Sequence, residues 1–540
     1  MRTPFLIFIT VALLLLASCK RQETPLPAEG EAAAPAYGDT FIEASIGEPS
    51  NLLPVLASDS ASADISALVY DGLVRYDKNL RLEGELAESW EISDDNLTIT
   101  FHLRQGVKWH DGTPFTSADV LFTYRLYVDP KTPTAYAEAY RQVAKAEAPD
   151  PYTFRVTYTM PYAPALGSWG VSILPRHLLE GVEVTKSPLS RQPVGTGPYR
   201  FVEWKSGEKL VLEANPDYFE GPPYIKRVVY RIIPDLSTQF LELQSGGLDF
   251  MGLTPIQYQT QTDTPAFRRQ FNKYSYLAFS YTYLGYNLRR PIFQDRRVRQ
   301  ALSYAIDKQE LIDGVLLGLG QAATGPFKPD TWVYNPDVPR YPFDPERARA
   351  LLAEAGWRDS DGDGILDKDG KPLAFTIVTN QGNDLRVKSG EIIQRRFREV
   401  GVDVKLRVIE WASFLKEFID PGNFDATILG WSTGPEPDQY DIWHSSKTGP
   451  RELNFIQFKN AEVDELLEKG RRTFDQAERK KAYDRFQEIL AEEQPYTFLY
   501  VGKALPAVAK RFRGIEPAPA GILYNFPKWY VPASEQRYAR

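Results

Sequence analysis

An acidic loop is the clearest candidate for a chemical site in this sequence. The segment DSDGDGILDKDG, residues 359–370, has acidic residues at positions 1, 3, 5 and 9 and a glycine at position 6. This is the pattern of oxygen ligands around a calcium ion. Position 12 is Gly370, so the bidentate glutamate of such loops is absent. Two interpretations stay open: a solvated acidic turn, or a structural calcium ion bound by Asp359, Asp361, Asp363 and Asp367.

The other reactive residues lack the spacing of catalytic or metal sites. The sequence has no GxSxG motif, and residues 195–198 (GTGP) lack the third glycine and the lysine of a phosphate loop. They predict a turn that enters a strand at Tyr199. We therefore expect no catalytic residue and no cofactor. Structural roles are favoured over a metal site for the four histidines, which form no HExxH motif: His102, His110, His177 and His444.

Composition limits the function classes further. The chain has 540 residues, of which 43% are hydrophobic and 25% charged, which is enough for several packed domains. Its formal net charge of −8 gives no electrostatic footprint for nucleic acid. A single cysteine cannot form an internal disulfide or a cysteine-rich metal site. With 71 acidic residues, chance carboxylate pairs carry no argument for a glycoside hydrolase, and an exported hydrolase is kept only as a rival hypothesis.

The position of the single cysteine predicts how the chain is targeted. A basic start is followed by an apolar run, residues 5–17, that is too short to span a membrane comfortably and is typical of an export signal. Residues 16–19 (LASC) resemble the bacterial lipobox, which implies removal of residues 1–18 and lipidation of Cys19. Residues 19–37, rich in Pro, Ala and Glu, then form a tether. The alternative is an ordinary signal with a chance cysteine. We expect an exported protein on the periplasmic or cell-surface face, anchored to a membrane through Cys19.

Hydrophobic periodicity from residue 39 onward predicts alternating strands and helices. Apolar and polar residues alternate, as in half-buried strands, in residues 97–103, 208–214, 373–379, 403–410 and 424–431. Asp344 and Pro345 begin a helix that Gly356 ends. Further helices are expected over residues 295–317, 385–399, 462–469 and 476–492. The helix-then-strand order of residues 345–431 predicts a lobe with a partly parallel sheet, so the fold class is α/β in the mixed α+β sense.

Five segments, in order along the chain, carry a family resemblance. They are GEPSNLLPVLASDSASADISALVYDGLVRYD (47–77), LAESWEISDDNLTITFHLRQGVKWHDGTPFTSADVLFTY (86–124), PVGTGPYRFVEWKSGEKLVLEANPDYF (193–219), FQDRRVRQALSYAIDKQELI (293–312) and DPERARALLAEAGW (344–357). The chain resembles the bacterial extracellular solute-binding proteins of family 5, the peptide-, nickel- and oligosaccharide-binding proteins of ABC importers.

The resemblance implies a two-lobed periplasmic-binding-protein clamshell with an extra subdomain, the lobes being joined by two crossover strands. Lobe I is expected from residues 38–70, 186–281 and 505–536, the extra subdomain from 71–185 and lobe II from 282–504. It also implies a function: capture of peptides or peptide-like solutes between the lobes and delivery to ABC transporter permease subunits. The same receptor role for an oligosaccharide, nickel or another small solute is the alternative. The expected protein is a monomer with no enzymatic activity and no nucleic-acid partner.

The resemblance also implies where a ligand binds. Family peptide binders pair the ligand's amino group with an aspartate three residues after the tryptophan that ends a strand, here Trp431. That position is Gly434, so Glu436 or Asp438 is left to supply a carboxylate from the same loop. A basic residue for a ligand carboxylate is replaced by Ile428. These departures weaken the case for short free peptides that are held by both charged ends.

Aromatic and polar residues complete the expected site. Trp411 matches a site tryptophan of the family, and aromatic faces line side-chain pockets or stack on sugar rings. Tyr283, Tyr286 and Asn287 lie at the expected crossover into lobe II. For each of these residues a purely structural role is the alternative. On the N-terminal segment, Asn51 and residues 58–60 are further candidates to reach the cleft.

Overall fold

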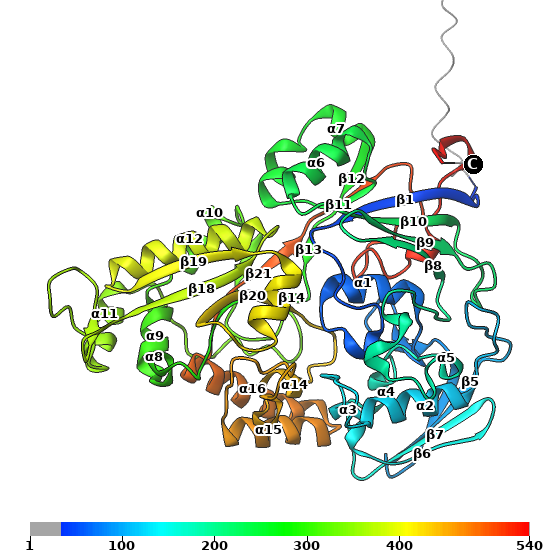
Figure 1. The fold of residues 1–540 in the computed structure, drawn as a ribbon, viewed down its shortest axis with the longest axis horizontal. Coiled ribbons are helices and arrows are strands. Elements are labelled where there is room, and N and C mark those ends of the chain that lie inside the picture. Colours follow the sequence, from blue (N-terminus) through cyan, green and yellow to red (C-terminus); the bar gives the residue numbers. More distant parts are fainter. Residues whose placement is uncertain (1–33, 539–540) are drawn as a thin grey trace, which may run out of the picture. The chain divides into compact units, whose positions relative to one another are not determined.

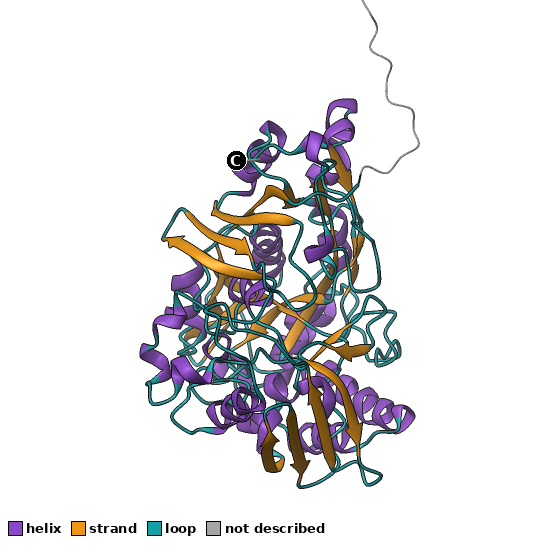
Figure 2. Ribbon diagram, turned by 90° about the vertical axis from the view of Figure 1, so that its right-hand side faces the viewer, coloured by secondary structure: helices purple, strands orange, loops and turns teal. Residues whose placement is uncertain are grey.

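The computed structural model describes residues 34–538, and the chain from Ala36 onward forms one compact unit. The predicted export signal, Cys19 and most of the predicted tether lie outside the described residues. Helices and strands are interspersed along the described chain, which confirms the mixed α/β class (Figure 2). Within that part of the chain, no helix is long and apolar enough to cross a membrane.

Lobe I contains two sheets built from distant parts of the sequence (Figure 1). The first has the strand order β1 (Gly38–Ser45), β10 (Ile225–Ile232), β9 (Lys209–Ala214) and β8 (Tyr199–Lys205), with β1 parallel to β10 and the other pairs antiparallel. In the second, β22 (Pro506–Ala509) lies between β11 (Phe250–Gly252) and β12 (Phe271–Lys273). Helices α1 (Ser60–Val69) and α6 (Leu236–Ser245) contribute Ile65, Val69 and Leu243 to its core.

Buried charges connect the ends of the chain within lobe I. The Arg511 guanidinium is only 6% exposed and forms ion pairs with Asp39, on β1, and with Asp249, at 2.8 Å. It also donates a hydrogen bond of 3.0 Å to the carbonyl of Thr40. Because a buried charge needs partners to offset its desolvation, these contacts hold the first and last segments of the lobe together.

The extra subdomain is an antiparallel sheet with a covering helix. Its strand order is β4 (Ala87–Ile92), β5 (Thr98–Leu103), β7 (Thr153–Tyr158) and β6 (Val143–Asp150). Helix α2 (Ser117–Val128) begins with a capping box between Thr116 and Asp119, which satisfies free backbone N–H groups of its first turn. The short helix α3 (Glu138–Arg141) follows. The core of the subdomain is continuous with that of lobe I.

Lobe II is organised around a seven-stranded sheet. The strand order is β13 (Tyr276–Leu277), β21 (Tyr496–Ala504), β14 (Ser280–Tyr286), β20 (Ala426–Ser432), β18 (Ala374–Asn380) and β19 (Asp403–Ile409), with β15 (Gly320–Ala322) also paired to β21. One face packs on α9 (Arg296–Tyr304), α11 (Pro345–Glu354) and α12 (Asp384–Glu399). The other packs on the π-helical turn η5 (Phe414–Ile419), α14 (Tyr440–Trp443), α15 (Ala461–Arg472) and α16 (Gln476–Glu493).

Two paired chain segments join the lobes. β13 pairs antiparallel with β21, Tyr276 opposite Ala504 and Leu277 opposite Lys503. One segment leads from β12 into β14 and the other returns from β21 into β22. These are the two crossover strands that the resemblance implied. The segment boundaries assigned to the lobes and subdomain from the sequence stay a prediction.

Most of the elements expected from periodicity are present. The five predicted strands correspond to β5, β9, β18, β19 and β20, and β18 pairs in parallel with both β19 and β20, as the partly parallel sheet requires. The single helix expected over residues 295–317 is wrong. The chain forms α9 and then α10 (Lys308–Gly314), because the Asp307 carboxylate accepts hydrogen bonds from the backbone N–H groups of Gln309 and Glu310 and begins a new helix.

The GTGP segment is a turn that enters β8, as predicted, and the structure explains its glycines. A Cβ atom on Gly195 would lie 1.8 Å from the carbonyl oxygen of Val69, so only glycine fits there. His110 fixes the same turn: its Nδ1 atom accepts a 3.2 Å hydrogen bond from the Gly195 N–H, and its Nε2 atom lies 3.0 Å from the carbonyl of Gly197. The imidazole is therefore neutral, and burial lowers its pKa to about 4. His110 has a structural role.

Candidate ligand-binding cleft

A cavity of about 910 Å³ lies between lobe I with its subdomain and lobe II. Ligand pockets for small molecules typically span roughly 300–1,000 Å³, so this volume suits a ligand with several side chains. The loop before α1 and residues of the extra subdomain form one wall. The start of β14, the end of β20, α12 and the turn η5 form the other. A ligand in this cavity therefore contacts both lobes.

Trp411 lies on the lobe II wall and also contacts lobe I. The short helix α13 (Trp411–Ser413) begins at Glu410, whose carboxylate accepts hydrogen bonds from the N–H groups of Ala412 and Ser413. The indole packs against Gly47, where an added Cβ would lie 2.9 Å from the Cβ atom of Trp411. The Trp411 Nε1 atom is buried and has no hydrogen-bond partner among the described residues. Trp411 thus lines the cavity at a contact between the two lobes.

Trp431 lies in the cavity wall at the end of β20. Its ring centroid is 5.8 Å from that of Phe455, which also lines the cavity, and its Nε1 atom donates a 3.3 Å hydrogen bond to the Tyr496 hydroxyl. That hydrogen bond fixes the indole from behind. The structure therefore brings both predicted tryptophans to the cavity.

The loop after Trp431 places its carboxylates against arginines. Asp438 lines the cavity, and both of its oxygens accept hydrogen bonds, of 2.9 and 2.8 Å, from Nε of the buried Arg471. Glu436 forms an ion pair with Arg479 and is not part of the cavity wall. Gly434 also lies outside the wall, with nothing within 4 Å of an added Cβ. The carboxylates that sequence reasoning assigned to the ligand are thus already paired with protein cations.

Three predicted residues lie behind the cavity wall. Tyr283 stacks on Tyr496 with ring centroids 3.8 Å apart, and the Tyr286 hydroxyl lies 2.8 Å from the Thr497 hydroxyl. The Asn287 side-chain amide donates hydrogen bonds to the carbonyls of Gly422 and Phe424, at 3.1 and 2.8 Å. All three are buried in lobe II. The cavity is lined instead by the residues that begin β14: Ser280, Tyr281 and Thr282.

On the lobe I side, the serines of the N-terminal segment reach the cavity. Ser58 and Ser60 line it together with Asp59. Asn51 does not; its side-chain oxygen accepts a 2.8 Å hydrogen bond from the N–H of Leu53, which orders the segment behind the wall. The segment singled out by resemblance therefore contributes a polar edge to the cavity.

Sequence reasoning missed a buried lysine among carboxylates at the lobe boundary. The Lys447 side chain is 2% exposed, and its Nζ atom lies 3.6 Å from Glu138 of α3, 3.5 Å from Asp441 and 3.3 Å from Glu452. Asp441 and Glu452 line the cavity, whereas Glu138 belongs to the extra subdomain. Burial raises the pKa of Asp441 to about 6. We call these four residues the Lys447 cluster, and it connects lobe II to the subdomain.

A cationic side chain missed by sequence reasoning also lines the cavity. Arg386, in the first turn of α12, donates a 2.8 Å hydrogen bond from Nη1 to the side-chain oxygen of Asn380. Its Nε atom has no partner among the described residues, and burial lowers the pKa of the guanidinium. A free donor on a charged group at the wall is suited to an anionic ligand group.

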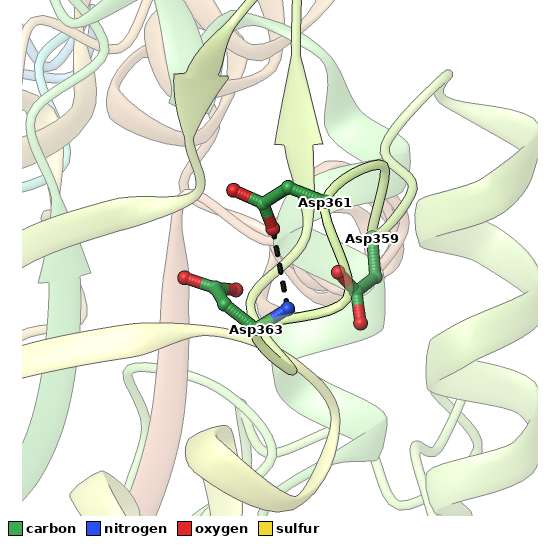
Figure 3. Close-up of side chains that lie close together, drawn as sticks. All are labelled: Asp359, Asp361 and Asp363. Atoms are coloured by element: carbon green, nitrogen blue, oxygen red, sulfur yellow. Dashed lines mark hydrogen bonds between the residues drawn. The ribbon is translucent and has the colours of Figure 1, made fainter.

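The acidic loop lies outside the cavity wall and brings three of its four predicted ligands together (Figure 3). Asp359, Asp361 and Asp363 are exposed, with a carboxylate oxygen of each within 4.8 Å of the others. The Asp361 carboxylate accepts a 3.2 Å hydrogen bond from the N–H of Asp363. Asp367 instead accepts hydrogen bonds from the backbone and hydroxyl of Ser360. Calcium binding stays a prediction. Among the described residues, the histidines join no such group.

Comparison with known proteins identifies the family. A family model described as "Bacterial extracellular solute-binding proteins, family 5 Middle" matches residues 81–452. The oligopeptide-binding protein AppA of Bacillus subtilis is 36% identical over 539 residues, which cover 97% of each chain. The chain belongs to the family 5 extracellular solute-binding proteins. Heme-binding protein A of Haemophilus influenzae is 30% identical over 550 residues, covering 95% of this family 5 chain and 96% of that relative.

Solved structures match this family 5 protein over most of its length. AppA of B. subtilis in complex with a nonapeptide is 36% identical, with a TM-score of 0.88 over 92% of this chain and 100% of the other. NikZ of Campylobacter jejuni in complex with Ni(L-His) has a TM-score of 0.82 at 29% identity, over 92% and 99% of the two chains. The two-lobed fold is thus shared by proteins solved with different ligands. The matching family model describes extracellular proteins, which agrees with the export that the sequence predicts.

Proposed function

We propose that this protein is the substrate-binding component of an ABC importer and that it captures peptides. The observation that carries the proposal is an unpaired strand edge in the cavity. β20 pairs with β14 as far as Ser432, but with β18 only at Ala426 and Thr427. Beyond Thr427, one edge of β20 therefore has no strand partner within residues 34–538, and residues 429–432 line the cavity.

An extended peptide is the ligand that such an edge suits. A peptide that adds to the edge as a strand gains backbone hydrogen bonds that do not depend on its sequence, while the cavity volume accommodates its side chains. The relative solved with a nonapeptide is named an oligopeptide-binding protein, and the periplasmic binding protein DppA of Helicobacter pylori is solved in complex with the peptide STSA, which supports this ligand class. Arg386 is positioned to receive a ligand carboxylate. Trp411 and Trp431 supply aromatic walls for side chains.

Binding between the lobes gives the transport signal. A ligand that contacts both lobes stabilises the closed state alone and shifts the population toward it. We infer that the closed form is what the permease subunits recognise, that the protein is held at a membrane by lipidated Cys19, and that it releases its ligand unchanged. A Cys19→Ser protein should be exported yet carry no radioactive fatty acid.

Mass spectrometry of the ligand released on denaturing the purified protein tests the ligand class. A mixture of peptides is the expected result. Recovery of an oligosaccharide, a haem or a nickel complex would show that this compound, and not a peptide, is the ligand. The receptor role would stay the same. Conversion of a bound peptide into fragments by the pure protein would favour the hydrolase hypothesis instead.

A further inference from the structure

The extra subdomain contacts lobe II at the end of the cavity that lies away from the crossover strands. The Glu138 carboxylate, on α3, lies 3.6 Å from Nζ of Lys447 in lobe II. A second contact joins the two backbones: the N–H of Ala163 donates a 2.6 Å hydrogen bond to the carbonyl of Arg471, on α15. In Figure 1, α3 and α15 lie at the bottom of the view, well below the crossover strand β13.

The cavity extends from the crossover strands to this contact. Ser280, three residues after β13, lines it at one end, and Asp441 and Glu452, which pair with Lys447, line it at the other. The core of the subdomain is continuous with that of lobe I, so the subdomain moves with that lobe. A rotation about the crossover strands displaces distant atoms most. Opening of the cleft therefore separates Glu138 from Lys447, and their contact belongs to the closed state.

Each side chain of this ion pair keeps a partner of opposite charge when the pair separates. Glu138 also pairs with Arg141, one turn further along α3, at 3.1 Å. Lys447 keeps Asp441 and Glu452, which belong to lobe II as it does, at 3.5 and 3.3 Å. A buried charge that loses its only partner is strongly destabilising, but neither charge is left alone here. The pair can therefore break and form in every cycle of binding and release.

We propose that Glu138 and Lys447 form a latch that stabilises the closed state before a ligand binds. The inference rests on the proposed capture of a solute between the lobes, and it gives the extra subdomain a role in closure. Both side chains lie outside the cavity wall, so the latch acts through the positions of the lobes and not through the ligand. It therefore raises the affinity for every ligand by the same factor, because only the closed fraction changes.

The distance between two dyes measures the closed fraction. In a Cys19→Ser background, which removes the single cysteine, the dyes attach only to cysteines introduced by Lys131→Cys in the subdomain and Glu465→Cys in lobe II, both at exposed positions. Unfolding in guanidinium chloride, dialysis and refolding remove bound ligand. Single-molecule energy transfer then compares this labelled parent with Glu138→Gln and with the control Glu88→Gln. The control removes the same charge from an exposed strand position of the subdomain that forms no ion pair within residues 34–538.

We expect a detectable closed fraction in the ligand-free parent and in Glu88→Gln. In Glu138→Gln the ratio of closed to open molecules should be about fivefold lower, because the variant loses an ion pair whose side chains are 9% and 2% exposed. Arg141→Gln should act in the opposite direction. It removes the partner that Glu138 keeps in the open state, so the ratio of closed to open molecules should rise, which damage to folding would not produce.

A tryptic casein digest distinguishes the latch from a contact with the ligand. Native mass spectrometry should find the same peptides on Glu138→Gln as on the parent, each with a half-saturating digest concentration that is higher by up to about fivefold. Loss of some peptides with retention of others would overturn the latch, because it would make Glu138 part of the binding site.

The ligand-free proteins decide the latch independently of the ligand class. Equal closed fractions in the parent and in Glu138→Gln would overturn it, and so would a ligand-free parent that is entirely open. If no casein peptide binds the parent, the proposed peptide-binding function fails, whereas the comparison of the ligand-free proteins still supports or overturns the latch.

Discussion

Two groups of carboxylates in the cleft differ in where their counter-ion comes from. In the Lys447 cluster, three carboxylates from two structural units surround a lysine that the protein supplies. Asp59 and Asp420 also come from two units, but neither forms an ion pair among the described residues, and Arg451 lowers the pKa of Asp420 without such a contact. The first arrangement holds lobe II against the subdomain by itself. The second has no such ion pair among the described residues, so similar side chains at the cleft are joined by a protein cation in one place and not in the other.

The largest effect is expected from removing the lysine of the Lys447 cluster. Lys447→Met leaves Glu138, Asp441 and Glu452 partly buried without their cation, and breaking such a pair typically costs about 3–5 kcal/mol of unfolding free energy. Thermal unfolding of the unliganded protein measures the loss. A triple variant that adds Glu138→Gln and Asp441→Asn to Lys447→Met tests the cause of this loss. If the triple variant is no more stable than Lys447→Met alone, repulsion between the carboxylates does not cause the loss of stability.

The stability that Asp441 of the Lys447 cluster contributes should depend on pH. The folded-state pKa of Asp441, about 6, lies above its ordinary value near 4, so the folded protein binds this proton more tightly than the unfolded chain does. The stability that this group contributes is therefore present at pH 4 and lost as the pH rises through 6. Relative to Asp441→Asn, the wild type should lose up to about 3 kcal/mol between pH 4 and pH 7. A constant difference between the two proteins across this range would contradict the assignment.

Removing the charge of Asp420 should change the free energy of unfolding in the opposite direction from Lys447→Met and by a smaller amount. Asp420→Asn removes a partly buried charge, and burial raises the pKa of this carboxyl in spite of the attraction to Arg451. The variant also breaks no hydrogen bond of the described residues, so it should be as stable as wild type or more stable by up to about 1 kcal/mol. Urea unfolding checks this against Asp94→Asn, which removes the same charge from an exposed turn. Destabilisation by more than 1 kcal/mol would mean that Asp420 has a structural partner in the unliganded state.

The smallest effect is expected at Gly434. Nothing lies within 4 Å of an added Cβ there, and its φ angle is not in the left-handed region. Gly434→Asp should therefore change the free energy of unfolding by no more than an ordinary surface substitution does, about 0.5 kcal/mol, as measured by urea unfolding. A loss of more than about 1 kcal/mol would mean that position 434 packs against other residues in the folded protein.

Local signals in the sequence predicted the elements well. Alternation found β5, β9, β18, β19 and β20, and the Asp–Pro start and glycine end found α11. The same periodicity joined α9 and α10 into one helix, because the apolar stripe continues across Ala305 and Ile306 while the break depends on the Asp307 side chain. Periodicity reports which face is buried, whereas a helix boundary can depend on a single hydrogen bond.

The cleft was only partly predictable. Both tryptophans reach the cavity wall, but Tyr283 and Tyr286 lie behind it, because only the first residues of β14, 280–282, line the cavity and the rest of the strand is buried inside lobe II. Lys447 and Asp420 had no sequence signal at all. Their surroundings come from segments hundreds of residues apart, such as Glu138 beside Lys447, and only the folded chain places them together.

The central position of β22 has a consequence for when the protein folds. This strand lies between β11 and β12, and Arg511 just after it pairs with Asp39 near the beginning of the described chain. Lobe I therefore cannot be completed until the last segment of the chain has been synthesised, and its closing contacts span most of the sequence. Contacts of such long sequence separation form slowly. The first lobe therefore stays incomplete until the whole polypeptide is available, although most of its residues precede lobe II in the sequence.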